Sequence, residues 1–69
     1  MASKSEVIEA LERKLGAIAK GNHYVAISIH PWTKDPWIRG LHKVPRDWFE
    51  EVHVPGYVLE VSGDYLVIR

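Results

Sequence analysis

Residues 57–69 read YVLEVSGDYLVIR, two short apolar runs separated by a Ser-Gly-Asp step at 62–64. Both runs carry apolar residues on both faces of the expected strands, and the Ser-Gly-Asp step is typical of a tight turn. The pattern predicts a β-hairpin. Leu59 and Val61 share one face of this hairpin, while Val58 lies on the other. A lone two-stranded hairpin cannot bury two apolar faces, so another part of the chain, or a second copy, must cover them.

The first third of the chain predicts a helix over residues 3–20, followed by a strand over residues 23–30. Ser3 and Glu6 have the spacing of a capping box, and Gly21 supplies the left-handed residue that ends many helices. Residues 23–30 alternate β-branched residues with other types and stop at a proline, as strands do. One apolar stripe along the helix consists of Val7, Ile8, Leu11, Leu15 and Ile18.

The middle of the chain predicts a second strand and a short helix. Two Pro-Trp pairs bracket a turn at residues 33–35, and a strand is expected from Trp37 to Val44. Pro45 suits the first turn of a helix because its φ is fixed and its missing amide costs nothing there. The expected order is therefore helix, strand, strand, short helix, strand, strand, which is an α+β chain.

The length of the chain, 69 residues, predicts a single domain over residues 1–69 with little surface to bury. Because there is no Cys, disulfides and thiolate metal sites are excluded, and a homodimer or a higher oligomer becomes the expected source of added stability. Charged residues occur near the N-terminus where a signal peptide needs an apolar run, and no stretch approaches the roughly 20 apolar residues of a membrane span. We expect a cytoplasmic protein with no membrane partner.

Histidines are numerous but do not form the pattern of a metal site. They fall on separate predicted elements, without the paired spacing on a helix that zinc sites use. No combination of nucleophile, base and orienting residue is evident either. We therefore expect no metal, no cofactor and no catalytic residues, that is, a protein that is not an enzyme. The four histidines are His23, His30, His42 and His53.

Charge is unevenly distributed along the sequence although the net charge is zero. Residues 20–46 hold five basic residues against Asp35 alone, whereas residues 47–69 hold five acidic residues against Arg69 alone. An anion-binding face is therefore expected in the middle third. The alternative interpretation is an ordinary mixed surface, because small charge blocks arise readily in solvated loops.

The run GLHKVPRDWFEEVHVPGYVLEV, residues 40–61, resembles the AbrB/MazE-like swapped-hairpin family (SpoVT-AbrB type) of DNA-binding domains. The resemblance covers residues 23–69 and leaves the helix of residues 3–20 outside. It implies a β-β-α-β-β core in which two chains interleave their hairpins into one small dimeric barrel. The motif elements are Gly40, Val44-Pro45, Arg46-Asp47, Pro55-Gly56 and residues 58–61.

The same resemblance implies a dimeric DNA-binding transcription regulator, or the DNA-binding part of an antitoxin. Such a protein reads double-stranded DNA with basic residues of its first two strands and their loop, where cations replace the counterions of phosphates. Arg39 and Lys43 share one face of the predicted second strand, and Trp32 or Trp37 can pack on sugar or base surfaces. The family usually has basic residues at the positions of Leu41 and Phe49. The candidate nucleic-acid-binding residues are Lys34, Trp37, Arg39, Lys43 and Arg46.

Two alternatives remain open at this point. The apolar stripe of the N-terminal helix could bind another protein, which would make the chain an interaction or assembly module without a nucleic-acid role. In addition, the segment Lys20-Gly21-Asn22-His23 looks like the glycine-histidine segment of HicA-type RNA-cleaving toxins, in which His23 would be a general acid/base. That family ends in a helix, whereas this chain is expected to end in a hairpin.

Overall fold

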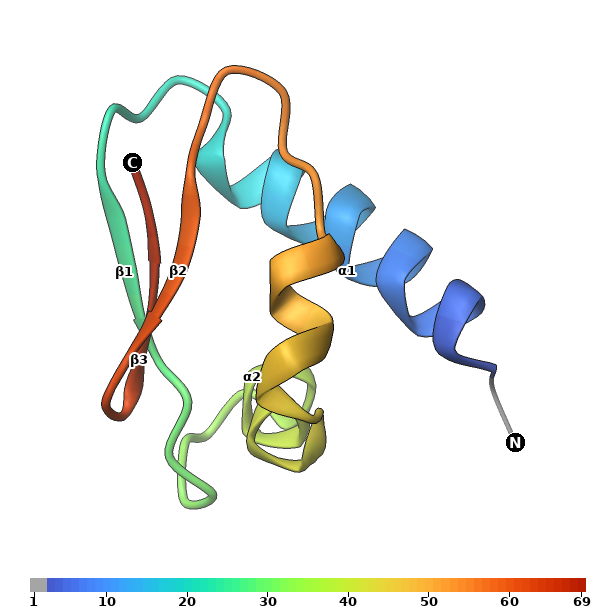
Figure 1. The fold of residues 1–69 in the computed structure, drawn as a ribbon. Coiled ribbons are helices and arrows are strands. Elements are labelled where there is room, and N and C mark those ends of the chain that lie inside the picture. Colours follow the sequence, from blue (N-terminus) through green and yellow to red (C-terminus); the bar gives the residue numbers. More distant parts are fainter. Residues whose placement is uncertain (1–2) are drawn as a thin grey trace.

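A computed structural model describes residues 3–69 (Figure 1). Residues 1 and 2, which belong to the predicted domain, lie outside the described residues. The chain is α+β, as predicted, with an N-terminal helix and one antiparallel sheet. Its elements are helix α1 (Lys4–Ala19), strand β1 (Val25–Ser28), helix α2 (Pro36–Gly40), the 3₁₀ helices η1 (Leu41–Lys43) and η2 (Arg46–Glu51), and strands β2 (Leu59–Ser62) and β3 (Tyr65–Ile68).

Helix α1 begins and ends where the sequence predicts. The Ser3 hydroxyl oxygen accepts a hydrogen bond from the backbone N–H of Glu6 at 3.3 Å, which satisfies one of the free donors at the helix start. After Ala19 the chain turns through Gly21, whose φ of 82° is a conformation that other residues rarely adopt. Leu11, Leu15 and Ala19 form the buried stripe of this helix.

The predicted hairpin is confirmed, and β3 is the central strand of the sheet. Strand order is β1-β3-β2, with both pairs antiparallel. Tyr65 pairs with Ser28 on one side and with Ser62 on the other. Gly63 adopts a positive φ of 59° in the turn between β2 and β3. Both neighbours of β3 are thus found within one chain.

The predicted second strand over Trp37–Val44 is wrong, because this segment is helical. One carboxylate oxygen of Asp35 accepts hydrogen bonds from the backbone N–H groups of Trp37 (2.8 Å) and Ile38 (3.3 Å), which is the geometry of an N-cap. Pro36 then occupies the first helical position, where proline is favoured. The core is therefore not β-β-α-β-β, and Arg39 and Lys43 do not share a strand face.

The short helix expected after Pro45 is present as η2. Pro45 lies one residue before the first helical position rather than in it. The side chain of Phe49 turns into the core, while Trp48 is half-buried with the ammonium of Lys4 5.9 Å from its ring centroid.

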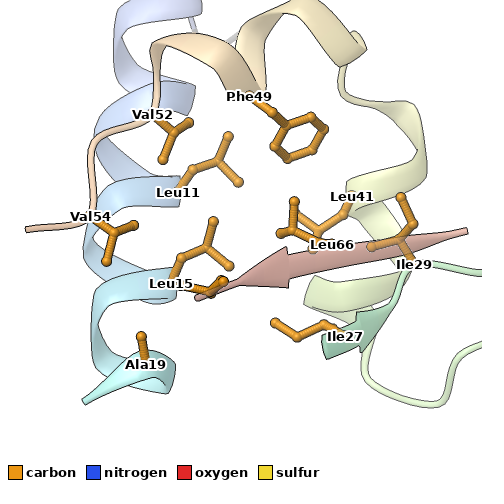
Figure 2. Close-up of a cluster of buried hydrophobic side chains, with 11 residues drawn as sticks. Leu11, Leu15, Ala19, Ile27, Ile29, Leu41, Phe49, Val52, Val54 and Leu66 are labelled. Carbon is orange, nitrogen blue, oxygen red and sulfur yellow. The ribbon is translucent and has the colours of Figure 1, made fainter. Parts of the chain in front are cut away.

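The core lies between the sheet and the helices that cover one of its faces (Figures 1 and 2). Leu66 and Ile68 of the central strand are fully buried, and each such side chain contributes about 1.5–3 kcal/mol by its removal from water. Two hydrogen bonds connect α1 to the second half of the chain. The Tyr57 hydroxyl donates to the Ala19 carbonyl at 3.0 Å, and the Glu12 carboxylate accepts from the backbone N–H of His53 at 3.1 Å. The buried cluster within residues 3–69 is Leu11, Leu15, Ala19, Ile27, Ile29, Leu41, Phe49, Val52, Val54, Leu66 and Ile68.

No helix within residues 3–69 is both long enough and apolar enough to cross a membrane.

Candidate nucleic-acid interface

Four of the five predicted binding residues are exposed cations on consecutive segments between β1 and β2. Lys34 lies in the loop after β1, Arg39 in the last turn of α2, Lys43 at the end of η1 and Arg46 at the start of η2. The acidic residue of this stretch, Asp35, has a carboxylate oxygen engaged in capping α2. We call His30 together with the exposed residues of 31–46 the basic end.

Hydrogen bonds join the basic end to the turn of the hairpin. The guanidinium of Arg46 donates to the Gly63 carbonyl at 3.1 Å, and the backbone N–H of Ile29 donates to the Asp64 carbonyl at 2.9 Å. A hollow of 90 Å³ lies between His30, His42, Arg46 and Asp64. The loop after β1, η1, the start of η2 and the hairpin turn therefore form one continuous surface.

Trp37, the fifth predicted residue, lies elsewhere. Its side chain is half-buried and packs against the core cluster, and the ammonium of Lys14 lies 5.9 Å from its ring centroid. These contacts cover part of the ring. Trp37 therefore mainly holds α2 against α1, and it is poorly placed as a stacking surface for a ligand.

Trp32 is the exposed aromatic residue of the basic end. Its ring stacks on that of His30 with centroids 4.7 Å apart and planes 11° apart, yet the residue is 75% exposed. His30 in turn meets Tyr65 edge-on at 6.4 Å. Sequence reasoning considered Trp32 but missed His30 and Tyr65 as its neighbours. The signal that links them is strand pairing, since Tyr65 lies opposite Ser28, two residues before His30.

Negative charge is concentrated on η2, which carries the exposed residues Asp47, Glu50 and Glu51. Glu51 forms an ion pair with Lys4 of α1. The hydrogen bond that the Lys4 ammonium donates to this carboxylate, together with the charge of the carboxylate, raises the pKa of Lys4 above its ordinary value, against a smaller opposing effect of desolvation. The acidic side therefore meets the basic end at Arg46, which lines one hollow together with Asp47, Glu50 and Glu60.

No group of three or more His, Cys, Asp or Glu residues within residues 3–69 is arranged to hold a metal ion. His42 is instead engaged locally, with its ring nitrogen Nδ1 against the backbone carbonyl of Arg39. His23 is exposed in the link between α1 and β1.

In comparisons with known proteins, no family model, no curated protein and no solved structure matches this chain.

Proposed function

We propose that this chain is a non-enzymatic nucleic-acid-binding module that contacts phosphates through the basic end. The observation that carries the proposal is that four exposed cations follow one another on consecutive segments of the chain, after a Trp32–His30 stack whose tryptophan is exposed, and that His30 and Arg46 border one hollow. Cations on such a surface release the counterions of phosphates, which supplies binding energy that does not depend on sequence. An exposed aromatic pair adds a flat apolar surface on which a base or sugar can pack.

The order of the elements supports this proposal by analogy. Helices α2 and η1 are followed, after Val44-Pro45, by η2 and then by the β2–β3 hairpin. This is the connectivity of a winged helix-turn-helix, a motif in which the second helix commonly enters the major groove of DNA. In this chain, however, the second helix is acidic. We therefore assign the phosphate contacts to α2, η1 and Arg46 rather than to the rest of η2.

Although the core is not β-β-α-β-β, the sequence of residues 40–61 resembles the AbrB/MazE-like family, and this resemblance favours the same class of ligand. Leu41 and Phe49, which stand where that family usually has basic residues, are each only 3% exposed and belong to the core. The exposed Arg39, Lys43 and Arg46 nearby supply cations in their place. A dimeric transcription regulator or antitoxin acting on double-stranded DNA is the biological setting that we propose for such a module.

A charge reversal tests the proposal. Arg39→Glu should weaken binding to a mixed-sequence DNA duplex and lower the slope of log affinity against log salt by about one unit, as expected for the loss of one phosphate contact. Arg13→Glu is the matched control, because it changes the net charge equally at an exposed position of α1. Fluorescence anisotropy of a labelled duplex at several salt concentrations measures both quantities. Equal effects of the two variants, or no binding by the unaltered protein, would contradict the proposal.

A second candidate function, a protein-interaction module, is favoured by a groove between α1 and α2. The groove has a volume of 600 Å³ and is lined by Val7, Ala10 and Trp37, with Glu6 and Arg13 among its charged residues. Because α1 is acidic near its start and basic at residues 13 and 14, two antiparallel copies would bring opposite charges together. Ala10→Arg should then abolish any dimer detected by light scattering and leave DNA affinity unchanged. A dimer that survives this substitution would exclude the groove as its interface.

A further inference from the structure

The outer face of the sheet, turned away from the core, carries most of the large exposed apolar side chains. In Figure 1 the helices lie on one side of the three strands. Strand alternation buries Ile27, Leu66 and Ile68 on that side and places their neighbours on the other. Tyr24, just before β1, is 64% exposed, and Tyr65 of β3 is 48% exposed. Within residues 3–69, this face has no cover of its own.

Tyr24 and Tyr65 line a shallow hollow on this outer face. Ala26 and Val67, which pair with each other across β1 and β3, also line it, and Ser62 completes it; the volume is 270 Å³. Tyr65 lies opposite Ser28, and Tyr24 comes four residues before Ser28. At about 3.3 Å per residue, the two tyrosines are therefore about 13 Å apart along the strand direction. The small side chain of Ala26 leaves space between them. The hollow therefore offers aromatic walls and an apolar floor to a planar ring.

The hollow is continuous with the basic end. Tyr65 contacts His30 edge-on, and His30 stacks on Trp32, so aromatic rings lead from the outer sheet face into the loop that carries Lys34 and to the hollow that His30 shares with Arg46. A ligand that fits both parts must offer flat rings and negative charges in one flexible chain. Single-stranded nucleic acid does so, whereas the bases of a duplex are stacked on one another and cannot enter the hollow.

We propose that the outer sheet face binds single-stranded nucleic acid, with an unpaired base in the hollow between Tyr24 and Tyr65 and the adjoining phosphates at the basic end. This inference rests on the phosphate binding proposed above for the basic end, and it adds single strands, bound through the outer sheet face, to the duplex proposed there. Sheets that present aromatic side chains to unpaired bases bind RNA in this way.

A second copy of the chain is the competing occupant of this face. The ion pair between Glu60 and Arg69, at 2.5 Å, argues against it. Glu60 lies opposite Val67, so this pair belongs to the outer face and would lose water in a dimer interface. A nucleic-acid strand that lies across β1 and β3 leaves this pair, at β2 and the end of β3, in water.

The test compares a labelled oligothymidylate of about 12 nucleotides, a length suited to a small single-strand site, with a DNA duplex. Tyr24→Ala should weaken oligothymidylate binding by roughly 5- to 150-fold, the range expected for the loss of one stacked base, and should change duplex binding by less than about twofold. Tyr24→Phe keeps the ring and should retain the affinity. Because Tyr24 is exposed, its truncation leaves the core intact, and a thermal melt checks this.

The results separate this inference from the proposed function. Suppose that the unaltered protein binds duplex or single-stranded DNA in a salt-dependent manner. If Tyr24→Ala then leaves the affinity for the single strand unchanged, the inference fails and the proposed function stands. If neither nucleic acid binds, both fail. A dimer in the absence of nucleic acid that Tyr24→Ala dissociates would overturn the inference in favour of self-association.

Discussion

Asp35 holds the start of α2, and its replacement by Ala tests the helical assignment of residues 36–43 directly. The substitution removes the acceptor of both N-cap hydrogen bonds. N-cap replacements by Ala cost about 0.5–2 kcal/mol. Because one of these two bonds is short (2.8 Å) and the other long (3.3 Å), we expect a loss near the middle of that range, about 1 kcal/mol.

The expected loss is measurable as a lower melting temperature or a lower urea midpoint. For a domain of this size, about 1 kcal/mol corresponds to a decrease in melting temperature of about 4–8 °C. The effect should extend to the core, because α2 leads directly into Leu41, which is buried. Backbone NMR chemical shifts of residues 37–43 provide a second measurement, since helix and strand displace the Cα shift in opposite directions.

Asp35→Asn is the control for this prediction. Asn is about as good an N-cap as Asp, so Asn should lose only the charge contribution, which is about 0.3 kcal/mol for an exposed residue in physiological salt, well below the loss expected for Ala. The reasoning would be refuted if Asp35→Ala left the melting temperature unchanged, or if the Asn and Ala variants lost the same amount.

Three further predictions concern stability. Leu66→Ala in the central strand should lower the free energy of unfolding by about 2–5 kcal/mol, because Leu66 is fully buried; urea unfolding measures this, and a loss below about 1 kcal/mol would contradict the core assignment. Tyr57→Phe removes the hydrogen bond to the Ala19 carbonyl and should cost about 0.5–1.5 kcal/mol in the same assay, with an unchanged midpoint as the contrary result. Because Glu51 raises the pKa of Lys4, the contribution of this pair is complete below the ordinary pKa of 10.5 and disappears as the pH rises through the higher folded-state value. Melting temperatures across that alkaline range should show a small step that Lys4→Met abolishes; persistence of the step in Lys4→Met would assign it to another group.

The elements that the sequence predicts correctly have strong local signals. Helix α1 has a regular apolar stripe together with a cap at Ser3 and a terminator at Gly21. The β2–β3 hairpin has two short, mostly apolar runs and a turn around Gly63. Each of these signals lies within a few residues of the structure it specifies, so no knowledge of the rest of the fold is needed to read it.

Helix α2 was missed because it has only five residues, too few to show a helical period. Its single clear signal is the Asp35-Pro36 step, an N-cap followed by a first-turn proline, which the prediction assigned to a turn. The segment from Trp37 to Val44 was predicted as a strand. In the structure β3 pairs with β1 and β2, so this segment is not needed as a strand of the sheet. The partner of β1 could not be predicted locally, since it lies near the other end of the sequence.

The candidate site was predicted in part. Counting charges identified Lys34, Arg39, Lys43 and Arg46, and the structure places all four as exposed residues on neighbouring segments. The aromatic part of the surface could not be found this way. His30 and Tyr65 are distant in sequence and meet only because β1 pairs with β3.

The central position of β3 has a kinetic consequence. Strands β2 and β3 are joined by a tight turn, so their hairpin can form within about 1–10 μs. By contrast, β1 must be brought to β3 across all of the intervening helices, and closing that long loop is slow because of its entropy. The hairpin alone is marginally stable at best. We therefore expect folding in a single cooperative step whose rate is set by the docking of β1 and α1 on a hairpin that forms and dissolves many times beforehand.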